Sequence, residues 1–511
     1  MFVTHQSDIQ RRKPPGKSRN NFITVTGGTL IQMIKFMNTV FLAFRNCFSR
    51  MAAFKWFVVT VTGIMLRADS MGGVTSVIRS LGLRPVYEPI NRLFRSDAWN
   101  LKSVEEAWQR YVASSAALIK VGGYAIIAGD GIKVSKEGKR IPGVKRLHQE
   151  SDNSSKPEYI SGLMYGGVGV LAGNGSQEYC IPLACEVQDG IAEIMKWDGN
   201  SGARRCSHVV EMITLAHHSA NAFGKALVTL DRYFLTVPAL DRLRVVNMYG
   251  NKLEAIIMAK ASTIAYEKPS ARLPGMRGRT RVKGASIKLA NLFEKESDQF
   301  KEIEIEIYGK RQKIKYHSVN LLWGQGLYQE LQFVLVDIEG RRVIIACTDT
   351  GLEPLDVIVI YAKRFKIEST FKSLKHDVAA FAHRFWTLAM PKLNRFAKKS
   401  DPDRHTKVKN KSERKKVRQA FDASERYVFC GLVALGILQM LSLSLFSKTD
   451  RRKFWYLRTM SKAVPSVATV ADYMRKSFFQ CLVNEPDLAI SQIIKEKSAA
   501  EMDNYYALEV S

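Results

Sequence analysis

Four side chains that could act on a phosphodiester occur at helical spacing near residue 365. At offsets of 0, 3, 7 and 14 residues, they are Tyr361, Arg364, Glu368 and Lys375. At about 100° per residue in an α-helix, all four fall within a stripe roughly 60° wide. A carboxylate binds metal ions and cations bind phosphates, so the stripe indicates a helix edge that handles phosphates. The same spacing also occurs on ordinary solvated helix faces that carry paired charges.

The same segment has an apolar side. Its apolar residues fall on a neighbouring stripe of the helix and are Ile367, Phe371, Leu374 and Val378. A helix with one apolar and one charged stripe packs its apolar side on a core. We therefore expect one continuous helix that starts at about residue 361, with Glu368 held at its edge.

Two aspartates can join Glu368 from elsewhere in the chain. Asp130 follows the apolar run Tyr124–Ala128, and Asp231 follows Ala226–Leu230. Each run predicts a short buried strand, and the ends of strands are where a sheet opens to ligands. An aspartate after a strand is common on its own. Three carboxylates on rigid elements, however, can hold a pair of magnesium ions for phosphodiester cleavage.

The order of these features adds a second line of evidence. The acids are separated by 231 − 130 = 101 and 368 − 231 = 137 residues, and a segment rich in predicted strands precedes the third acid. Over roughly residues 120–446, the chain closely resembles the DDE transposases of bacterial insertion sequences. It matches at every position the branch marked by Tyr-x2-Arg-x3-Glu-x6-Lys, and the aromatic residues Tyr233 and Phe234 follow the second acid as they often do in that family.

The resemblance implies an α/β fold with an RNase H-like catalytic core and an all-β insertion before the last acid. It implies two magnesium ions, for which manganese can substitute, bound by the catalytic residues Asp130, Asp231 and Glu368. By the same analogy, Arg364 and Lys375 bind phosphates beside the scissile bond, and Tyr361 contacts the DNA backbone or stacks near the cleaved end. Some family members capture a flipped base on a tryptophan of the insertion, and Trp323 is the candidate here, although Leu321-Leu322-Trp323 also suits a core.

The implied function is cut-and-paste DNA transposition. Metal-activated water would nick the transposon end, and the released 3′-hydroxyl would attack target DNA. The implied partners are double-stranded DNA, both terminal inverted repeats and target, and a second copy of the chain in a homodimer on paired ends. Two alternatives stay open: an RNase H-like endonuclease without strand transfer, and an inactive DNA-binding copy that acts as a repressor.

Changes of pattern along the chain predict five regions. They are a helical N-terminal region with possible DNA-end binding (1–118), the first part of the core (119–268), the β-rich insertion (269–350), the last part of the core with the Glu368 helix (351–446) and a helical tail (447–511).

Composition points to a polyanionic partner. The 511 residues include 77 Lys and Arg against 48 Asp and Glu, which gives a net charge of +29. Nucleic acid is the usual partner of such a charge excess, and an anionic membrane surface is the alternative partner.

The seven cysteines show no metal-binding spacing and are expected to be buried, reduced thiols of a cytoplasmic, nucleoid-associated bacterial protein. The uncharged run Val428–Phe446 is long enough for a marginal membrane span, but a buried core helix is favoured.

Three further basic segments could contact DNA. Residues 74–94 resemble a helix-turn-helix that offers arginines to phosphates, although a plain helical hairpin fits equally well; the arginines are Arg79, Arg84, Arg92 and Arg95. The stretch from Lys133 to Arg146 is expected to be a loop that follows DNA. Residues 395–418 suit either a solvated linker or a segment that tracks phosphates.

Overall fold

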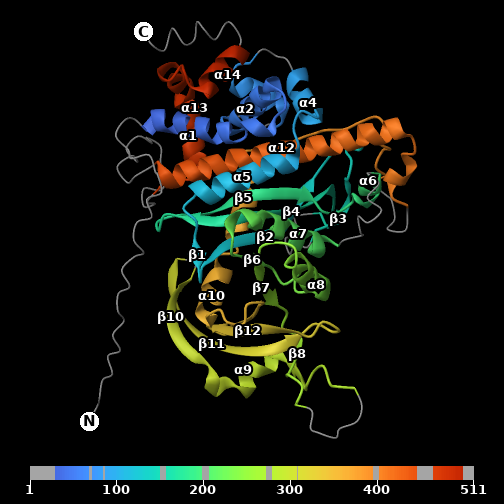
Figure 1. Ribbon diagram of the computed structural model, residues 1–511, viewed down its shortest axis with the longest axis vertical. Coiled ribbons are helices and arrows are strands. Elements are labelled where there is room, and N and C mark those ends of the chain that lie inside the picture. The colour runs from blue at the N-terminus through green and yellow to red at the C-terminus, as the bar shows by residue number, and fades with distance from the viewer. Residues whose placement is uncertain are drawn as a thin grey trace.

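The described part of the chain is built around one large mixed sheet (Figure 1). The computed structural model describes residues 29–67, 72–83, 87–149, 157–197, 207–271, 279–307, 309–394, 402–445 and 464–498. Within these residues the sheet has 13 strands in the order β3-β4-β2-β6-β7-β13-β12-β11-β8-β9, with β5 on β4, β1 on β2 and β10 on β11. The fold is therefore α/β, as the sequence predicts.

The strands fall into two groups along the chain. The first group is β1 Lys120–Val121, β2 Tyr124–Ser135, β3 Lys145–His148, β4 Tyr159–Gly173, β5 Glu178–Val187, β6 Ala226–Leu230, β7 Leu253–Ala259 and β8 Ile264–Tyr266. The second group is β9 Ser286–Lys288, β10 Lys301–Ile307, β11 Lys310–Trp323, β12 Gln329–Ile338 and β13 Arg341–Cys347.

The middle of the sheet is parallel and its neighbours are antiparallel. Strand β6 pairs in parallel with β2 on one side and with β7 on the other. All five residues of β6 are buried, as expected for an apolar strand covered on both faces. Strands β4 and β5 extend the sheet antiparallel beyond β2, and β13 joins it antiparallel to β7.

The described helices lie on and above this sheet. They are α1 Thr29–Ala43, α2 Met51–Met65, α3 Val74–Ser80, α4 Glu88–Arg95, α5 Leu101–Ser115, α6 Ala192–Lys196, α7 His208–Ala220, α8 Val237–Val246, α9 Leu292–Lys295, α10 Pro354–Ala362, α11 Lys366–His376, α12 Lys411–Ser444, α13 Val467–Asn484 and α14 Ala489–Lys497. Helices α5, α7, α11 and α12 all contact β5, and α1–α4 with α13 and α14 form a further helical layer beyond α12 (Figure 1).

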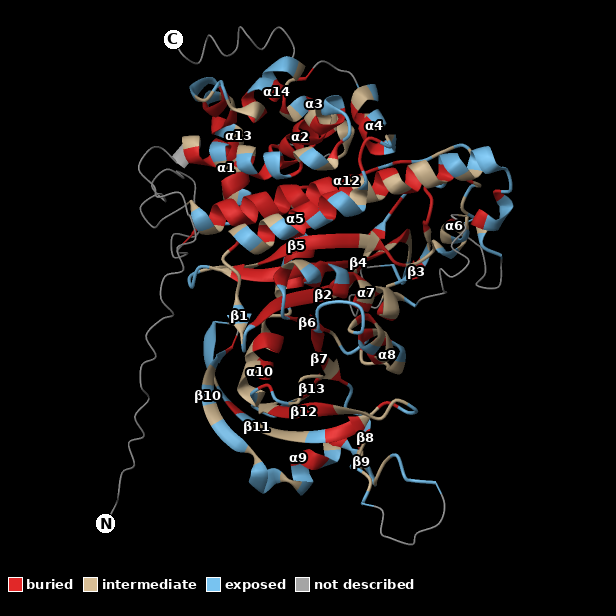
Figure 2. Cartoon of the chain, viewed as in Figure 1, coloured by how far each residue is buried: buried red, intermediate tan, exposed pale blue. Residues whose placement is uncertain are grey.

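Helix α12 is the central element of the helical layers. It runs for 34 residues, and every residue from Tyr427 to Ser442 is buried (Figure 2). Gly436 permits its close contact with α5, because a Cβ there would lie 2.3 Å from the ring of Trp108. Among the described helices, α12 alone is long and apolar enough to cross a membrane, and 89% of its most apolar window is buried inside the protein. The prediction of a buried core helix is confirmed.

The same helix corrects one prediction. From Lys411 onward, the basic segment is not a linker but forms the first turns of α12, and phosphate contact by its exposed lysines stays a prediction. Its periodic buried residues, such as Val417 and Phe421, make it continuous with the apolar part. Residues 395–401 lie outside the described part of the chain.

The predicted insertion contains two hairpins, β10–β11 and β12–β13. It is not all-β, because the short helix α9 precedes β10. Its sheet is also continuous with the core sheet, since Ile344–Cys347 of β13 pair with Ile256–Ala259 of β7. Apolar residues on both strands make this junction possible where a separate sheet would leave an open edge.

The terminal regions are helical where they are described. Helices α3 and α4 flank a turn with Gly82 at φ +56°, and Pro89 lies in the first turn of α4, where a missing N–H costs little. Both helices pack on α2, and α4 also packs on α12, which leaves the choice between a helix-turn-helix and a hairpin as a prediction. Arg84 and residues 1–28 lie outside the described residues.

The described cysteines carry no disulfide, and five of the six are buried.

Candidate functional site

Asp130 lies inside a strand, which corrects the prediction that it follows one. Strand β2 continues through Gly129-Asp130-Gly131 to Ser135, because β4 pairs with it along this whole length. Asp130 stands opposite Gly167 of β4. The two flanking glycines do not end the strand, since neither adopts a positive φ.

Asp231 directly follows β6, as predicted. Strands β2 and β6 are parallel with Ala128 opposite Thr229, so two residues further on the same register brings Asp130 beside Asp231. The backbone N–H of Tyr233 donates a 2.9 Å hydrogen bond to Asp231 Oδ1, which fixes the turn after the strand. Two acids 101 residues apart in sequence thus meet at one edge of the sheet.

The segment that carries the four-residue pattern is two helices instead of one. Helix α10 ends at Ala362 and α11 begins at Lys366. Between them the backbone N–H groups of Arg364 and Ile367 donate to Tyr361 and Arg364, three residues back, at 3.0 and 3.1 Å. Such bonds wind the chain more tightly than an α-helix, so the predicted single stripe does not form.

The apolar side of α11 packs as the sequence predicts. Ile367, Phe371 and Leu374 are buried against the sheet. Gly167 makes this approach possible, because a Cβ there would lie 2.7 Å from the Phe371 ring. Since Gly167 pairs with Asp130, the contact that seats α11 on the sheet also brings Glu368 toward Asp130.

Arg364 links the two acids directly. Its Nη1 donates to Asp130 Oδ2 at 3.1 Å and its Nη2 donates to Glu368 Oε1 at 2.8 Å. The Arg364 side chain is 15% exposed, whereas that of Glu368 is 58% exposed. The guanidinium therefore sits at the floor of the site, and Glu368 stands at its solvent side.

Burial raises the pKa of Asp130 to about 6. The positive charge of Arg364 opposes this rise, and the negative charge of Asp231 adds to it. Burial lowers the pKa of Arg364, but the nearby Asp130, Tyr361 and Glu368 raise it on balance. The carboxyls thus gather more negative charge than the single guanidinium offsets, which favours binding of a further cation.

The other predicted DNA-contacting residues lie at three places. Tyr361 is buried in the last turn of α10, which does not suit stacking on a free DNA end without rearrangement. Lys375 is exposed in the last turn of α11. Trp323 ends β11 and is half-buried, with part of its ring packed against the core, so both interpretations of it remain open.

His208 lies between the two aspartate-bearing segments and was not predicted. Its ring centroid is 5.3 Å from that of Phe234 and 6.0 Å from that of Tyr233, just after Asp231. On the other side it covers Gly131, where a Cβ would lie 2.9 Å from His208 Nε2. Burial lowers its pKa to about 4, so the imidazole is neutral at pH 7. No spacing in the sequence relates it to Asp130 or Asp231.

The basic stretch after Asp130 has a structural role that the sequence did not predict. Lys133 Nζ donates to the carbonyl of His148, and Arg140 Nη1 donates to the carbonyls of Leu388 and Met390. Lys136 is buried and donates to the carbonyls of Phe381 and His383, and burial lowers its pKa to about 7. Lys136 and Arg140 thus hold the segment after α11 in place, and Lys133 bonds the end of β3. Residues 133–135 belong to β2, so the expected loop starts later than predicted, and DNA contact by the exposed cations of this stretch stays a prediction.

No group of three or more His, Cys, Asp or Glu side chains is already arranged to hold a metal ion in the described residues. The donors at this site nevertheless suit magnesium, since they are hard carboxylate oxygens with incompletely offset charge. In this structure Asp130 and Glu368 bind the Arg364 guanidinium, which takes the place that a metal ion would occupy between carboxylates.

The substitution Arg364→Lys tests the bridging role. A lysine ammonium is a point charge and cannot hold two carboxylates in a fork. The DNA cleavage that the sequence resemblance implies should therefore fall about tenfold in the variant. Cleavage rates at saturating DNA measure this. Arg244→Lys is the matched control, because Arg244 makes a single exposed pair with Asp241 at 2.8 Å. Equal rates for both variants would remove Arg364 from the site.

No protein-family model matches this chain, and no curated protein matches it at a significant level.

Proposed function

We propose that this chain is a DDE-type transposase that catalyses cut-and-paste DNA transposition. The observation that supports this most is the bridge made by Arg364 between Asp130 and Glu368, with Asp231 in the neighbouring register position. Three acids and an arginine that the sequence resemblance assigns to one catalytic centre come from β2, β6, the α10–α11 turn and α11. An unrelated set of surface charges would have no reason to converge in this way.

An RNase H-like core is part of the proposal. It is supported by the strand order β5-β4-β2-β6-β7, in which β2, β6 and β7 are parallel and β4 and β5 are antiparallel extensions. Asp130 lies on the central strand, Asp231 follows its parallel neighbour, and Glu368 lies on a helix packed on β2, β4 and β5.

Asp130, Asp231 and Glu368 would hold the two magnesium ions. When bound, these ions would supply the activated water and neutralise charge on the phosphate. For Glu368 and Asp130 to act as ligands, Arg364 must share or release them, and a DNA phosphate is the natural new acceptor for its fork. Lys375, exposed on the same helix, would bind a phosphate further along the strand.

His208 would help to position Asp231. Its neutral ring packs on the two aromatic residues of the turn that follows Asp231 and on the strand that carries Asp130. A neutral imidazole adds no positive charge that would compete with a metal ion.

The proposed partners are double-stranded DNA, as transposon ends and target, and a second copy of the chain on paired ends. The net charge of +29 supports a polyanionic partner. We place the protein in the bacterial cytoplasm, associated with the nucleoid. Among the described residues, the burial of the long apolar helix α12 agrees with this placement.

The function is tested with DNA that contains the coding region and its natural flanks. Purified protein and magnesium should release a fragment with defined ends and join those ends to a second plasmid. Defined cleavage without joining would instead support an endonuclease. Binding to the flanks without cleavage, in magnesium or manganese, would support a repressor and contradict the proposal.

A further inference from the structure

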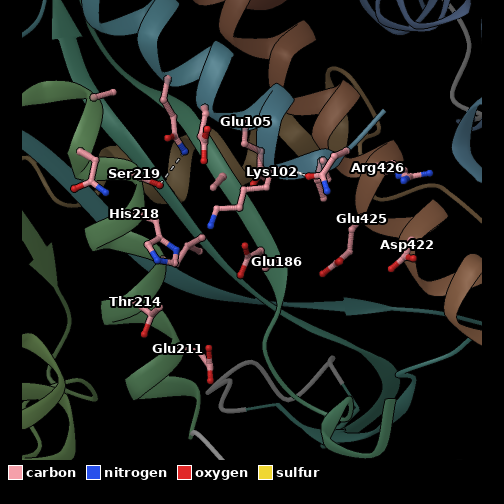
Figure 3. Close-up of a pocket in the computed structure, with 18 of the residues that line it drawn as sticks. Lys102, Glu105, Glu186, Glu211, Thr214, His218, Ser219, Asp422, Glu425 and Arg426 are labelled. Carbon is pink, nitrogen blue, oxygen red and sulfur yellow. Dashed lines mark hydrogen bonds between the residues drawn. The ribbon is translucent and has the colours of Figure 1, made fainter. Parts of the chain in front are cut away.

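An acidic cavity lies beside α7 and shares no lining residue with the candidate catalytic site. It opens to solvent, has a volume of about 690 Å³ and is lined by α5, β5, α7 and α12 (Figure 3). Its carboxylate-bearing residues come from all four elements and are Glu105, Glu106, Glu186, Glu211, Asp422 and Glu425. An acidic cavity is unexpected in a chain with a net charge of +29, so its charges need an explanation.

Most of the cations at the rim are already engaged. Arg418 Nε donates to Asp422 Oδ1 at 2.8 Å, and Arg110 lies 3.9 Å from Glu106. Arg426 points away from the cavity in Figure 3 and donates to the backbone carbonyls of Phe94, Ser96 and Trp99. The inner carboxyls of Glu105, Glu186, Glu211 and Glu425 therefore outnumber the cation that reaches among them, Lys102 (Figure 3).

One carboxylate oxygen in the wall has no partner. Glu105 is only 8% exposed, and its Oε1 accepts no hydrogen bond from any residue that the structure describes. Burial and repulsion by Glu186 and Glu425 raise the pKa of Glu105 well above its ordinary value. A buried acceptor without a donor costs about 1–3 kcal/mol, so a donor in the cavity would be favourable.

The arrangement does not suit a single metal ion. The described carboxylates include no group of three arranged to hold one, and the four inner carboxyls come one from each wall. Separated carboxyls around a volume typical of small-molecule sites suit a ligand with separated positive charges. Ammonium groups also supply several N–H donors each, which Glu105 Oε1 lacks.

We propose that this cavity binds a linear organic diamine or polyamine, with one ammonium group between Glu105 and Glu186 and another toward Glu425. The site goes beyond the proposed transposase activity and does not depend on it. None of its lining residues is Asp130, Asp231, Arg364 or Glu368.

The cavity is joined to the catalytic region by α7. Glu211 lines the cavity one turn after His208, which packs beside the Asp231 turn. A ligand that draws Glu211 inward would thus act on a helix that also supports the candidate catalytic residues. The first experiment concerns binding alone, so that it does not rely on catalysis.

Calorimetric titration of the DNA-free protein with 1,4-diaminobutane tests the site. The comparisons, at matched ionic strength, are butylamine, which carries one ammonium group, and magnesium chloride, which carries two charges on one ion. We expect one diamine per chain, bound at least about tenfold more tightly than butylamine, because the second ammonium adds a charge-assisted hydrogen bond. Equal affinity for the diamine and the monoamine, no binding of the diamine, or tighter binding of magnesium would overturn the proposal.

Variants locate the binding. Glu186→Gln and Glu105→Gln should each weaken diamine binding about tenfold or more, since each removes a carboxyl that gives up its proton to pair with an ammonium group. Glu304→Gln, at an exposed position on β10, is the matched control and should bind as the wild type does. Asp231→Asn should also bind normally, so a failed transposase assignment leaves this result intact. Unchanged affinity in the two cavity variants would place the diamine elsewhere and contradict the assignment.

Discussion

Replacing Asp231 with asparagine is expected to lower the rate of DNA nicking by at least about a hundredfold, because a lost metal ligand removes several kcal/mol of transition-state stabilisation. Asparagine has the same shape as aspartate and retains the oxygen that accepts from the Tyr233 N–H, so the turn after β6 should stay intact. DNA affinity should stay close to that of the wild type, since no positive charge is lost.

Nicking of a plasmid that carries the natural flanks measures this rate, and a gel-shift titration measures affinity. Asp298→Asn is the matched control, because Asp298 is exposed in the insertion between α9 and β10. Wild-type nicking by the Asp231 variant would falsify the catalytic assignment. Loss of both nicking and binding would point to a folding role for Asp231 and count against it as well.

Replacing Glu425 with glutamine is expected to stabilise the protein at high pH. Burial, with repulsion from Glu186, raises the pKa of Glu425 to about 8 in the folded protein, compared with an ordinary value near 4.5. The folded state therefore holds a proton that the unfolded state releases between these pH values, and stability declines as pH rises through this window. Glutamine removes the decline and still accepts the 3.1 Å hydrogen bond from the Val187 N–H.

The expected gain is about 1–3 kcal/mol in the free energy of unfolding above pH 8, and none below pH 4.5. Urea unfolding from pH 5 to 9 without added amines measures it. Glu413→Gln, at an exposed position in the first turn of α12, should change stability little across this range. If Glu425→Gln changes the free energy of unfolding equally at pH 5 and pH 9, the Glu425 carboxyl does not have a raised pKa in the folded protein.

Local patterns predicted the elements but not always their ends. Strand β6 has the predicted bounds, because it is an apolar run closed by turn residues. Strand β2 is longer than expected, since its pairing with β4 continues through Asp130. This pairing depends on a strand that lies elsewhere in the sequence, whereas the local pattern of two glycines beside Asp130 predicts a turn.

The candidate site was predictable as a set of residues but not in its geometry. Spacing alone placed Tyr361 and Glu368 on one helix stripe, but tight hydrogen bonds at Arg364 divide the segment and bury Tyr361. The bridge from Arg364 to Asp130 spans 234 residues, which no periodicity can indicate. The same holds for His208 and for Glu105, Glu186 and Glu425, which become neighbours only when four separate elements pack together.

The central claim is that Asp130, Asp231 and Glu368 form one metal centre on DNA. Counting bound manganese by electron paramagnetic resonance, on the complex with flanking DNA, tests it most directly. We expect two ions per chain in the wild type and the loss of at least one in both Asp130→Asn and Glu368→Gln, with Asp298→Asn unchanged. Equal manganese binding by all four proteins would contradict the account.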